Sequence, residues 1–162
     1  MARRTFFSFH YERDAWRAGQ VRNSWVTQDR ESAGFWDAAA WEEVKRKGDE
    51  AIHKWIDDQL KGTSVTVVLI GAETSQRKYV GYEITASHNK GNGMLGIYIH
   101  NMKDSRGNTD TKGANPFANW SIQQNGQKVL LSSIYPTYDW VNDDGRANIG
   151  TWIEAAAKKA GK

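Results

Sequence analysis

Two stretches of the chain consist almost entirely of apolar and β-branched residues. Residues 64–70 read Ser-Val-Thr-Val-Val-Leu-Ile, and residues 94–99 read Met-Leu-Gly-Ile-Tyr-Ile. A third stretch, residues 5–9, combines aromatic and β-branched side chains and ends at a polar cluster. Short apolar runs without polar alternation are typical of strands that are covered on both faces. The pattern therefore predicts three buried strands, of which residues 64–70 form the strongest.

Amphipathic segments separate the predicted strands, with apolar residues recurring at the three- to four-residue spacing of a helix face. Asp14 and Asn148 are of the types that cap helix N-termini, and Gly62 stands where a C-terminal stop is expected. Residues 34–37 fit a short second strand, and a charged stretch follows at residues 41–47. The predicted helices cover residues 15–27, 49–60, 77–90 and 148–161.

The alternation of buried strands with helices is the pattern of a parallel α/β sheet, because parallel strands need long crossover connections. This regularity stops at residues 101–117, a long polar segment of the kind that is usually functional or mobile. Asn125 and Gly126 then separate two short β-prone stretches, which predicts a two-residue hairpin turn. We therefore expect one α/β domain over residues 1–162, with an insertion at about 101–135 that carries the hairpin.

Length and composition fit a single folded domain of 162 residues and 18.3 kDa, of which 39% are hydrophobic. The absence of cysteine excludes disulfides and thiolate metal sites, and the four histidines lack metal-ligand spacing. The net charge of +3 is spread along the chain, so no nucleic-acid partner is expected. The longest apolar run is far shorter than a membrane span, and the start of the chain lacks a signal-peptide core. We expect a soluble cytoplasmic protein without a membrane partner.

Two short motifs imitate ligand sites without the structural context that those sites need. Residues 91–96 match the dinucleotide fingerprint, but a predicted helix precedes them and a strand follows, the reverse of what pyrophosphate binding needs. Asp139, Asp143 and Asp144 with Gly145 resemble a calcium loop without its alternating ligands or its closing glutamate. We interpret the first motif as a helix stop and a turn, and the second as a solvated turn.

One group of polar residues is expected to meet where the parallel strands end, the usual place for ligands in such folds. The first strand ends in residues 8–10, and the strongest strand is followed by residues 72–75. Glu83 lies in the second turn of the next helix, about 9 Å along its axis, so its carboxylate can overhang this edge. The same position allows a structural role in which Glu83 pairs with Lys78 or Arg77, and both interpretations stay open.

The opening strand and the helix after the strongest strand resemble those of TIR domains. Residues 4–10, Arg-Thr-Phe-Phe-Ser-Phe-His, are similar to the opening TIR strand, in which Ser stands between aromatic residues. Residues 78–84, Lys-Tyr-Val-Gly-Tyr-Glu-Ile, resemble the TIR helix in which an aromatic residue precedes the catalytic glutamate by a few positions. More narrowly, an ordered set of segments is similar to the TIR-like proteins of bacterial Thoeris antiphage defence. These segments are residues 6–11, 21–27, 64–71, 82–84, 115–117, 132–135 and 138–141.

The resemblance implies a flavodoxin-like, three-layer α/β sandwich whose central parallel sheet has the order 2-1-3-4-5. It also implies that NAD is cleaved at the nicotinamide–ribose bond, as a substrate and without a further cofactor. The ADP-ribosyl part would be cyclised, or otherwise transferred, to give an ADP-ribose signal nucleotide that activates a partner effector in antiphage immunity; a cyclic product is the form expected first. In such an enzyme Glu83 is the catalytic residue, which holds the ribose hydroxyls and stabilises the developing positive charge. The implied substrate-binding residues are Phe7, Ser8, Phe9, His10, Asp37, Trp41, Thr74, Ser75 and Tyr79.

The resemblance also leaves other functions to weigh. Many enzymatic TIR domains complete their site between two subunits, so a homo-oligomer formed through TIR–TIR contacts on activation is expected. Other TIR domains are non-catalytic adaptors that act only through such contacts, and this alternative stays open. A receiver domain would need clustered acids after the first strand, where this chain has Ser8, Phe9 and His10. A flavodoxin would need glycines there for a phosphate loop, and they are absent.

Overall fold

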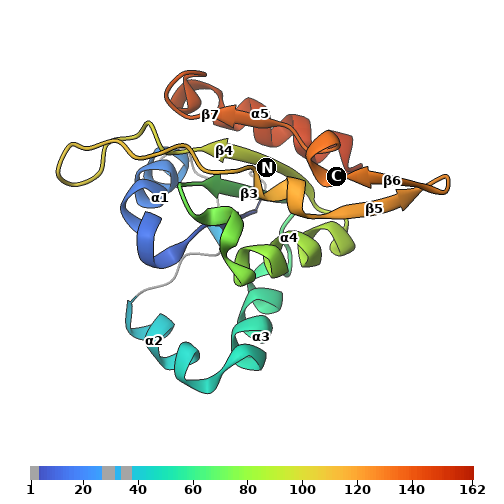
Figure 1. The fold of residues 1–162 in the computed structure, drawn as a ribbon, viewed down its shortest axis with the longest axis horizontal. Coiled ribbons are helices and arrows are strands. Elements are labelled where there is room, and N and C mark those ends of the chain that lie inside the picture. Colours follow the sequence, from blue (N-terminus) through green and yellow to red (C-terminus); the bar gives the residue numbers. More distant parts are fainter. Residues whose placement is uncertain (1–3, 27–31, 34–37) are drawn as a thin grey trace.

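The computed structural model describes residues 4–26, 32–33 and 38–162 (Figure 1). The predicted second strand at 34–37 lies outside these residues, and a two-residue strand at Ser32–Ala33 pairs with the first strand instead. The helices are α1 (Tyr11–Val26), α2 (Ala38–Lys47), α3 (Asp49–Leu60), α4 (Lys78–Lys90) and α5 (Gly145–Lys159), with short 3-10 helices η1 (Thr74–Gln76), η2 (Pro116–Asn119) and η3 (Leu131–Ser133). The strands are β1 (Thr5–Ser8), β2 (Ser32–Ala33), β3 (Val65–Ile70), β4 (Gly93–Tyr98), β5 (Ser121–Gln124), β6 (Gln127–Leu130) and β7 (Thr137–Asp139).

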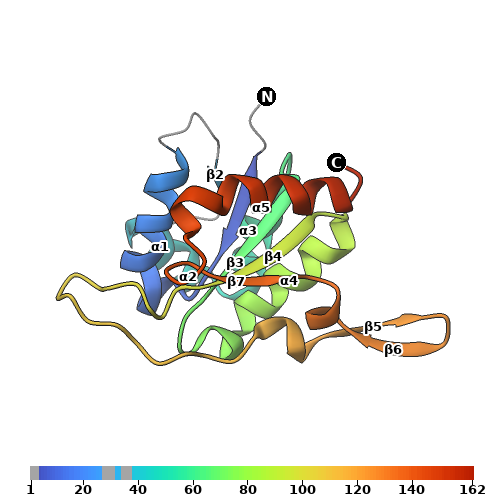
Figure 2. The same cartoon turned by 90° about the horizontal axis from the view of Figure 1, so that it is seen from above.

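The central sheet is parallel throughout and has the order β2-β1-β3-β4-β7. This is the predicted order 2-1-3-4-5, with β7 as the fifth strand of the sheet. All six residues of β3 are buried, as expected of an apolar strand with neighbours on both sides and helices on both faces. Figure 2 shows the strands side by side between the helices. The predicted flavodoxin-like topology is confirmed.

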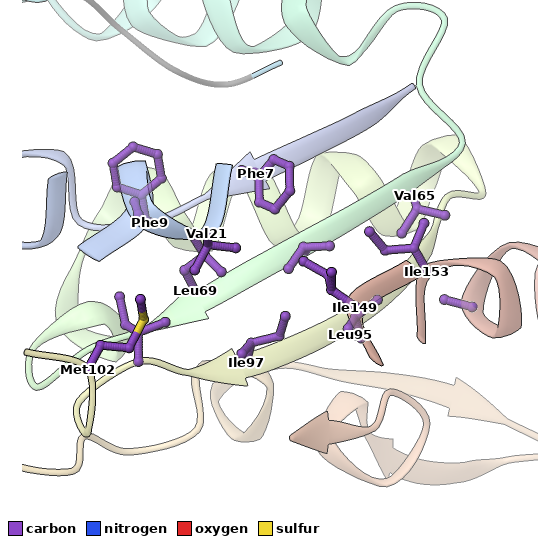
Figure 3. Packing of buried hydrophobic residues seen from close by; sticks show 14 of the residues in the cluster. Phe7, Phe9, Val21, Val65, Leu69, Leu95, Ile97, Met102, Ile149 and Ile153 are labelled. Atoms are coloured by element: carbon purple, nitrogen blue, oxygen red, sulfur yellow. The ribbon is translucent and has the colours of Figure 1, made fainter. Parts of the chain in front are cut away.

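The helices form two layers, one on each face of the sheet. Apolar residues of α1 and α5 pack against β1, β3 and β4 in the largest core cluster (Figure 3). On the other face, α3 packs against Phe6 of β1, and α4 packs against β3 and β4. Because side chains alternate along a strand, Phe7 points into the opposite layer from Phe6. Within the described residues, no helix has the length and apolarity needed to cross a membrane.

The segment between β4 and α5 contains the predicted hairpin. Strands β5 and β6 pair antiparallel on either side of Asn125 and Gly126. These two turn residues have φ values of 52° and 77°, the left-handed conformation that a type I′ hairpin requires at both positions. The hairpin prediction is confirmed. β7 was not predicted, because three half-buried residues give too short a pattern to recognise.

Two helices begin earlier than their polar residues indicated, so both predicted caps are wrong. α1 starts at Tyr11, and Asp14 lies inside it, buried, with its backbone N–H donating to the carbonyl of His10 (2.8 Å). α5 starts at Gly145, which places Asn148 in its first turn. In both cases the chain turns into the helix before the residue that has the best capping side chain.

Both ligand-like motifs are structural turns, as interpreted. Gly91 ends α4 in the left-handed conformation (φ 87°), and Gly93 already opens β4. The carboxylate of Asp143 accepts a hydrogen bond from the backbone N–H of Asp139 (2.7 Å), which closes the turn before α5.

Candidate functional site

A serine and a glutamate meet inside the protein at the carboxyl end of β1. Ser8 Oγ donates a hydrogen bond of 2.8 Å to Oε1 of Glu83. Ser8 is fully buried, and Glu83 is only 6% exposed. This is the edge where the parallel strands end, which is the usual place for ligands in such folds. The structure thus joins two residues, 75 positions apart, that the sequence analysis assigned to one site.

The periodicities of strand and helix direct these two side chains toward each other. Ser8 shares a face of β1 with Phe6, which packs against α3. On α4, Val80 and Ile84 are buried and apolar, and Glu83 lies between them on the inward side. The packing of α4 on the sheet therefore decides where Glu83 lies, and it removes the carboxyl of Glu83 from water.

Burial controls the charge of Glu83. Desolvation raises the pKa of its carboxyl from 4.5 to about 8, while the hydrogen bond from Ser8 acts in the opposite direction. The carboxyl is therefore largely protonated at neutral pH in this conformation. Among the described residues it forms no ion pair, because Lys78 Nζ bonds the carboxylate of Asp49 at 2.6 Å. The structural interpretation, in which a neighbouring cation neutralises Glu83, does not hold.

A small cavity adjoins the carboxyl of Glu83. Its volume of about 30 Å³ is enough for about one water molecule, whereas ligand pockets usually exceed about 300 Å³. The site is therefore closed in this structure, and one wall of the cavity comes from α3. The lining residues are Phe9, Tyr11, Ile52, Ile56, Arg77, Tyr79, Val80 and Glu83.

Arg77 brings a positive charge to this cavity. It is the residue immediately before α4, so its side chain starts at the same edge as the carboxyl end of β1. Burial, and then the charge of Arg77, lower the pKa of His10, which keeps this imidazole neutral. His10 Nδ1 accepts a hydrogen bond from the backbone N–H of Arg13 (3.3 Å), so His10 caps α1.

Tyr79 lines the cavity as predicted, but its hydroxyl is engaged in holding two helices together. It donates to Oδ1 of Asp49 (2.7 Å), the same carboxylate that binds Lys78. One turn further along α4, the ring of Tyr82 stacks on His53 with centroids 3.9 Å apart. These contacts fasten α3 to α4 beside the cavity.

Thr74 and Ser75 belong to the turn that connects β3 to α4. Thr74 is fully buried, and its Oγ1 accepts a hydrogen bond from the backbone N–H of Gly71 (2.8 Å). The carbonyl of Ser75 accepts from Nδ2 of Asn119 (2.9 Å). Neither residue lines the cavity beside Glu83. The structure gives both a part in shaping the turn from which α4 starts.

Phe7 requires a correction, because the structure places it away from the site. It is fully buried in the layer between the sheet and helices α1 and α5. The strand alternation that directs Ser8 to Glu83 necessarily directs Phe7 to the other face. Phe9 lines the cavity because β1 ends at Ser8 and the chain turns there. Trp41 has its backbone in α2, and Asp37 lies outside the described residues.

The sequence analysis did not assign five lining residues to the site, of which Val80 is the inward-facing neighbour of Glu83 on α4. Tyr11 comes soon after the end of β1, and Arg77 immediately precedes α4. Both positions lie at the edge of the sheet where the site was expected, which could have indicated these two residues. Ile52 and Ile56 are buried residues of α3, the amphipathic helix predicted over residues 49–60. Nothing in their sequence shows that this face covers Glu83, because that depends on the angle at which α3 crosses the sheet.

Two comparisons with known proteins cover this site. Residues 6–104 match the family described as Thoeris protein ThsB, TIR-like domain. Over 191 aligned residues the chain is 38% identical to ThsB1 of Bacillus cereus (strain MSX-D12), which is provisionally named a cyclic ADP-D-ribose synthase. This alignment covers 94% of the chain and 100% of that relative. The range 6–104 contains Ser8, Glu83 and all the residues that line the small cavity.

Proposed function

This chain belongs to the Thoeris ThsB family of TIR-like domains, and from this premise we propose that it is an enzyme that cleaves NAD and forms a cyclic ADP-ribose. The observation that carries the proposal is the buried carboxyl of Glu83, hydrogen-bonded to Ser8 at the ligand-binding edge of the sheet. NAD is the substrate and is consumed, so the reaction needs no additional cofactor.

The proposed reaction needs one carboxylate rather than a pair. The bond between nicotinamide and ribose breaks, and its electron pair goes to the ring nitrogen, so nicotinamide leaves as a neutral molecule. No general acid has to protonate it, unlike the leaving group of an ordinary glycoside. A nucleophilic oxygen or nitrogen of the same ADP-ribose unit then bonds to the anomeric carbon and loses a proton, which closes the ring. Glu83 stabilises the positive charge that develops at that carbon between the two steps.

The ionisation of Glu83 links substrate binding to catalysis. A protonated carboxyl cannot stabilise a cation, and the pKa of about 8 keeps Glu83 mostly protonated while the site is closed. The nicotinamide ring of NAD carries a positive charge, and an adjacent positive charge favours the ionised carboxylate. Binding of NAD next to Glu83 therefore produces the catalytic form. Ser8 contributes by donating its hydrogen bond to the oxygen that has to stay ionised.

The remaining lining residues fit the other parts of NAD. Phe9 and Tyr11, with ring centroids 6.2 Å apart, offer aromatic surface for the nicotinamide ring. Arg77 offers a guanidinium for the diphosphate, in place of the arginine that many TIR enzymes have where this chain has His10. The cavity of about 30 Å³ has to widen before NAD can bind, and Ile52 and Ile56 of α3 form the wall that has to move.

The partners follow from the same proposal. A soluble cyclic nucleotide acts only through a protein that binds it, so we propose a separate effector that senses this product. We also propose that copies of this chain associate through TIR–TIR contacts and that association opens the site. Association would then be the step that controls when NAD is consumed.

The test is incubation of the purified protein with NAD, with and without a lysate of phage-infected cells, followed by chromatography and mass spectrometry. We expect release of nicotinamide together with a product that has the mass of ADP-ribose less one water. A product with the mass of ADP-ribose itself would indicate hydrolysis instead of cyclisation. Intact NAD under every condition, including high protein concentration, would refute the enzyme and favour the non-catalytic adaptor.

The matched variants are Glu83→Gln and Glu154→Gln. The first removes the proposed charge while keeping the shape of the side chain and an oxygen for Ser8. The second makes the same chemical change at an exposed position of α5, remote from the cavity. We expect the first variant to lose at least about 100-fold in rate, in the range seen when electrostatic stabilisation is removed. The second should match the unmodified protein.

A further inference from the structure

A second and larger cavity beside this sheet does not include Glu83. It has a volume of about 540 Å³, within the range of small-molecule sites, and shares no residue with the cavity beside Glu83. Its walls come from the ends of α4 and α5, the start of β4, and residues 132–136 before β7. Figure 2 shows the C-terminal ends of α4 and α5 on the same side of the molecule, beside the β5–β6 hairpin.

The backbone of Met94 directs polar groups toward this cavity. The N–H groups of Gly93 and Ile99 donate to Ser64 and Ile70 on the β3 side. The N–H of Gly96 donates to Pro136, on the β7 side. Successive residues of a strand alternate between its two neighbours, so Met94 presents its N–H and C=O on the β7 side.

No strand pairs with Met94 on that side. The ladder between β4 and β7 covers only Gly96 to Tyr98, opposite Thr137 to Asp139. If the same register continued two residues further back, Met94 would pair with Tyr135, and its carbonyl would face the nitrogen of Pro136. Proline has no N–H, so it cannot donate to this carbonyl. Met94 is 1% exposed, and in the part of the chain that the structure describes neither of its two backbone groups has a partner on this side.

A buried peptide group without partners is unusual and points to something that binds it. More than nine in ten buried backbone groups are paired in native proteins. The alternation leaves an N–H donor and a C=O acceptor of one residue on the same edge, so a single group with one acceptor and one donor can satisfy both. A carboxamide has this arrangement, and so does the lactam edge of a nucleobase.

The walls of the cavity suit a flat, uncharged molecule. The parallel rings of Tyr138 and Trp152, stacked at 4.1 Å, and the ring of Tyr135 supply aromatic surface. Tyr135 is fixed by a 2.6 Å hydrogen bond between its hydroxyl and Nδ1 of His88. The ammonium group of Lys159 donates to the carbonyl of Ile134 (2.9 Å), and none of the described residues that line the cavity has a carboxylate. This charge distribution disfavours cations.

We propose that this cavity is a second ligand site, which binds a neutral, planar heteroaromatic molecule with a carboxamide or lactam edge. The edge pairs with the N–H and C=O of Met94, and the ring lies against the aromatic wall. The two sites differ in the charge of the ring that they accept. The site at Glu83 accepts the positively charged nicotinamide ring of NAD, whereas the second cavity accepts a neutral ring such as that of free nicotinamide. An extended peptide fits less well, because Gly96 and Tyr98 already pair with Pro136 and β7 on this edge, which leaves Met94 as the one residue of β4 for a peptide to pair with.

The test is a titration followed by two-dimensional ¹⁵N–¹H NMR of the intact protein with two probes, nicotinamide and hypoxanthine. The two probes distinguish a carboxamide ligand from a nucleobase. We expect the amide signals of Gly93, Met94 and Ala155 to shift, with dissociation constants on the order of 1 mM for such small molecules. Methyl nicotinate keeps the ring and the carbonyl but has no N–H donor, and should bind at least about tenfold more weakly.

Two variants of α5 provide the matched control. Ala155 is exposed and lines the cavity, so Ala155→Phe fills the site without disturbing the core. Ala147 is exposed on the same helix outside the cavity, so Ala147→Phe should bind like the unmodified protein. Ala155→Phe should abolish the shifts, and Glu83→Gln should keep them. Shifts confined to residues around Glu83, unchanged binding by Ala155→Phe, or no shift at Met94 with either probe would each overturn the proposal.

Discussion

Replacement of Glu83 by glutamine should make the protein more stable at alkaline pH. A carboxyl with a folded-state pKa of about 8, against 4.5 for an ordinary glutamate, holds its proton more tightly when the chain is folded. The carboxyl therefore stabilises the folded state most below pH 4.5, the pKa that Glu83 has in the unfolded chain. This contribution to the free energy of unfolding is lost as the pH rises toward 8, the pKa in the folded protein. Glutamine has no proton to lose, so the variant lacks this dependence.

The size of the effect follows from the two pKa values. One pKa unit corresponds to about 1.4 kcal/mol, and the folded carboxyl is half ionised at pH 8. Between pH 6 and pH 8 the contribution of Glu83 to the free energy of unfolding should therefore fall by about 2 kcal/mol. With a urea m-value of about 2 kcal/mol/M for a protein of this size, the midpoint should move by about 1 M.

The assay is urea unfolding of both proteins at several values between pH 5 and pH 9. The difference between their unfolding free energies isolates Glu83, because the other titrating groups are common to both. Asp14→Asn is a useful control, since burial raises the pKa of Asp14 to only about 6 and its effect lies mostly below that pH. Equal losses of stability by the unmodified protein and Glu83→Gln between pH 6 and pH 8 would refute the reasoning.

Three further predictions test neighbouring parts of the structure. Ser8→Ala removes the hydrogen bond that lowers the pKa of Glu83, so the pH profile of nicotinamide release should move to higher pH; an unchanged profile would contradict this. Arg77→Gln should raise KM for NAD by about tenfold and change kcat little. The variant removes a contact between the guanidinium and the diphosphate that is equally strong in the ground state and the transition state. Steady-state kinetics measure both constants, and a fall in kcat without a rise in KM would contradict this role. Gly96→Ala should cost about 1–3 kcal/mol in urea unfolding, since its Cβ would lie 2.8 Å from Cδ1 of Ile70.

The fold could be predicted largely from local pattern. The apolar runs that became β3 and β4 and the amphipathic helix α3 need no long-range information, because their residue periodicity alone decides which faces are buried. The hairpin turn was equally predictable, since Asn125 and Gly126 tolerate positive φ. The helix starts were less predictable. A turn of the chain at His10 began α1 before the polar side chain of Asp14 could cap it.

The candidate site divides in the same way. Sequence alone placed Ser8 and Glu83 at one edge, because parallel strands all end there and the helix after β3 must start there. Only the tertiary structure decided that their side chains meet, that Phe7 faces away, and that Ile52 and Ile56 close the cavity. Contacts of this kind depend on the angles between layers, and desolvation depends on every neighbour at once. The raised pKa of Glu83 and the unpaired backbone of Met94 are therefore properties of the folded chain.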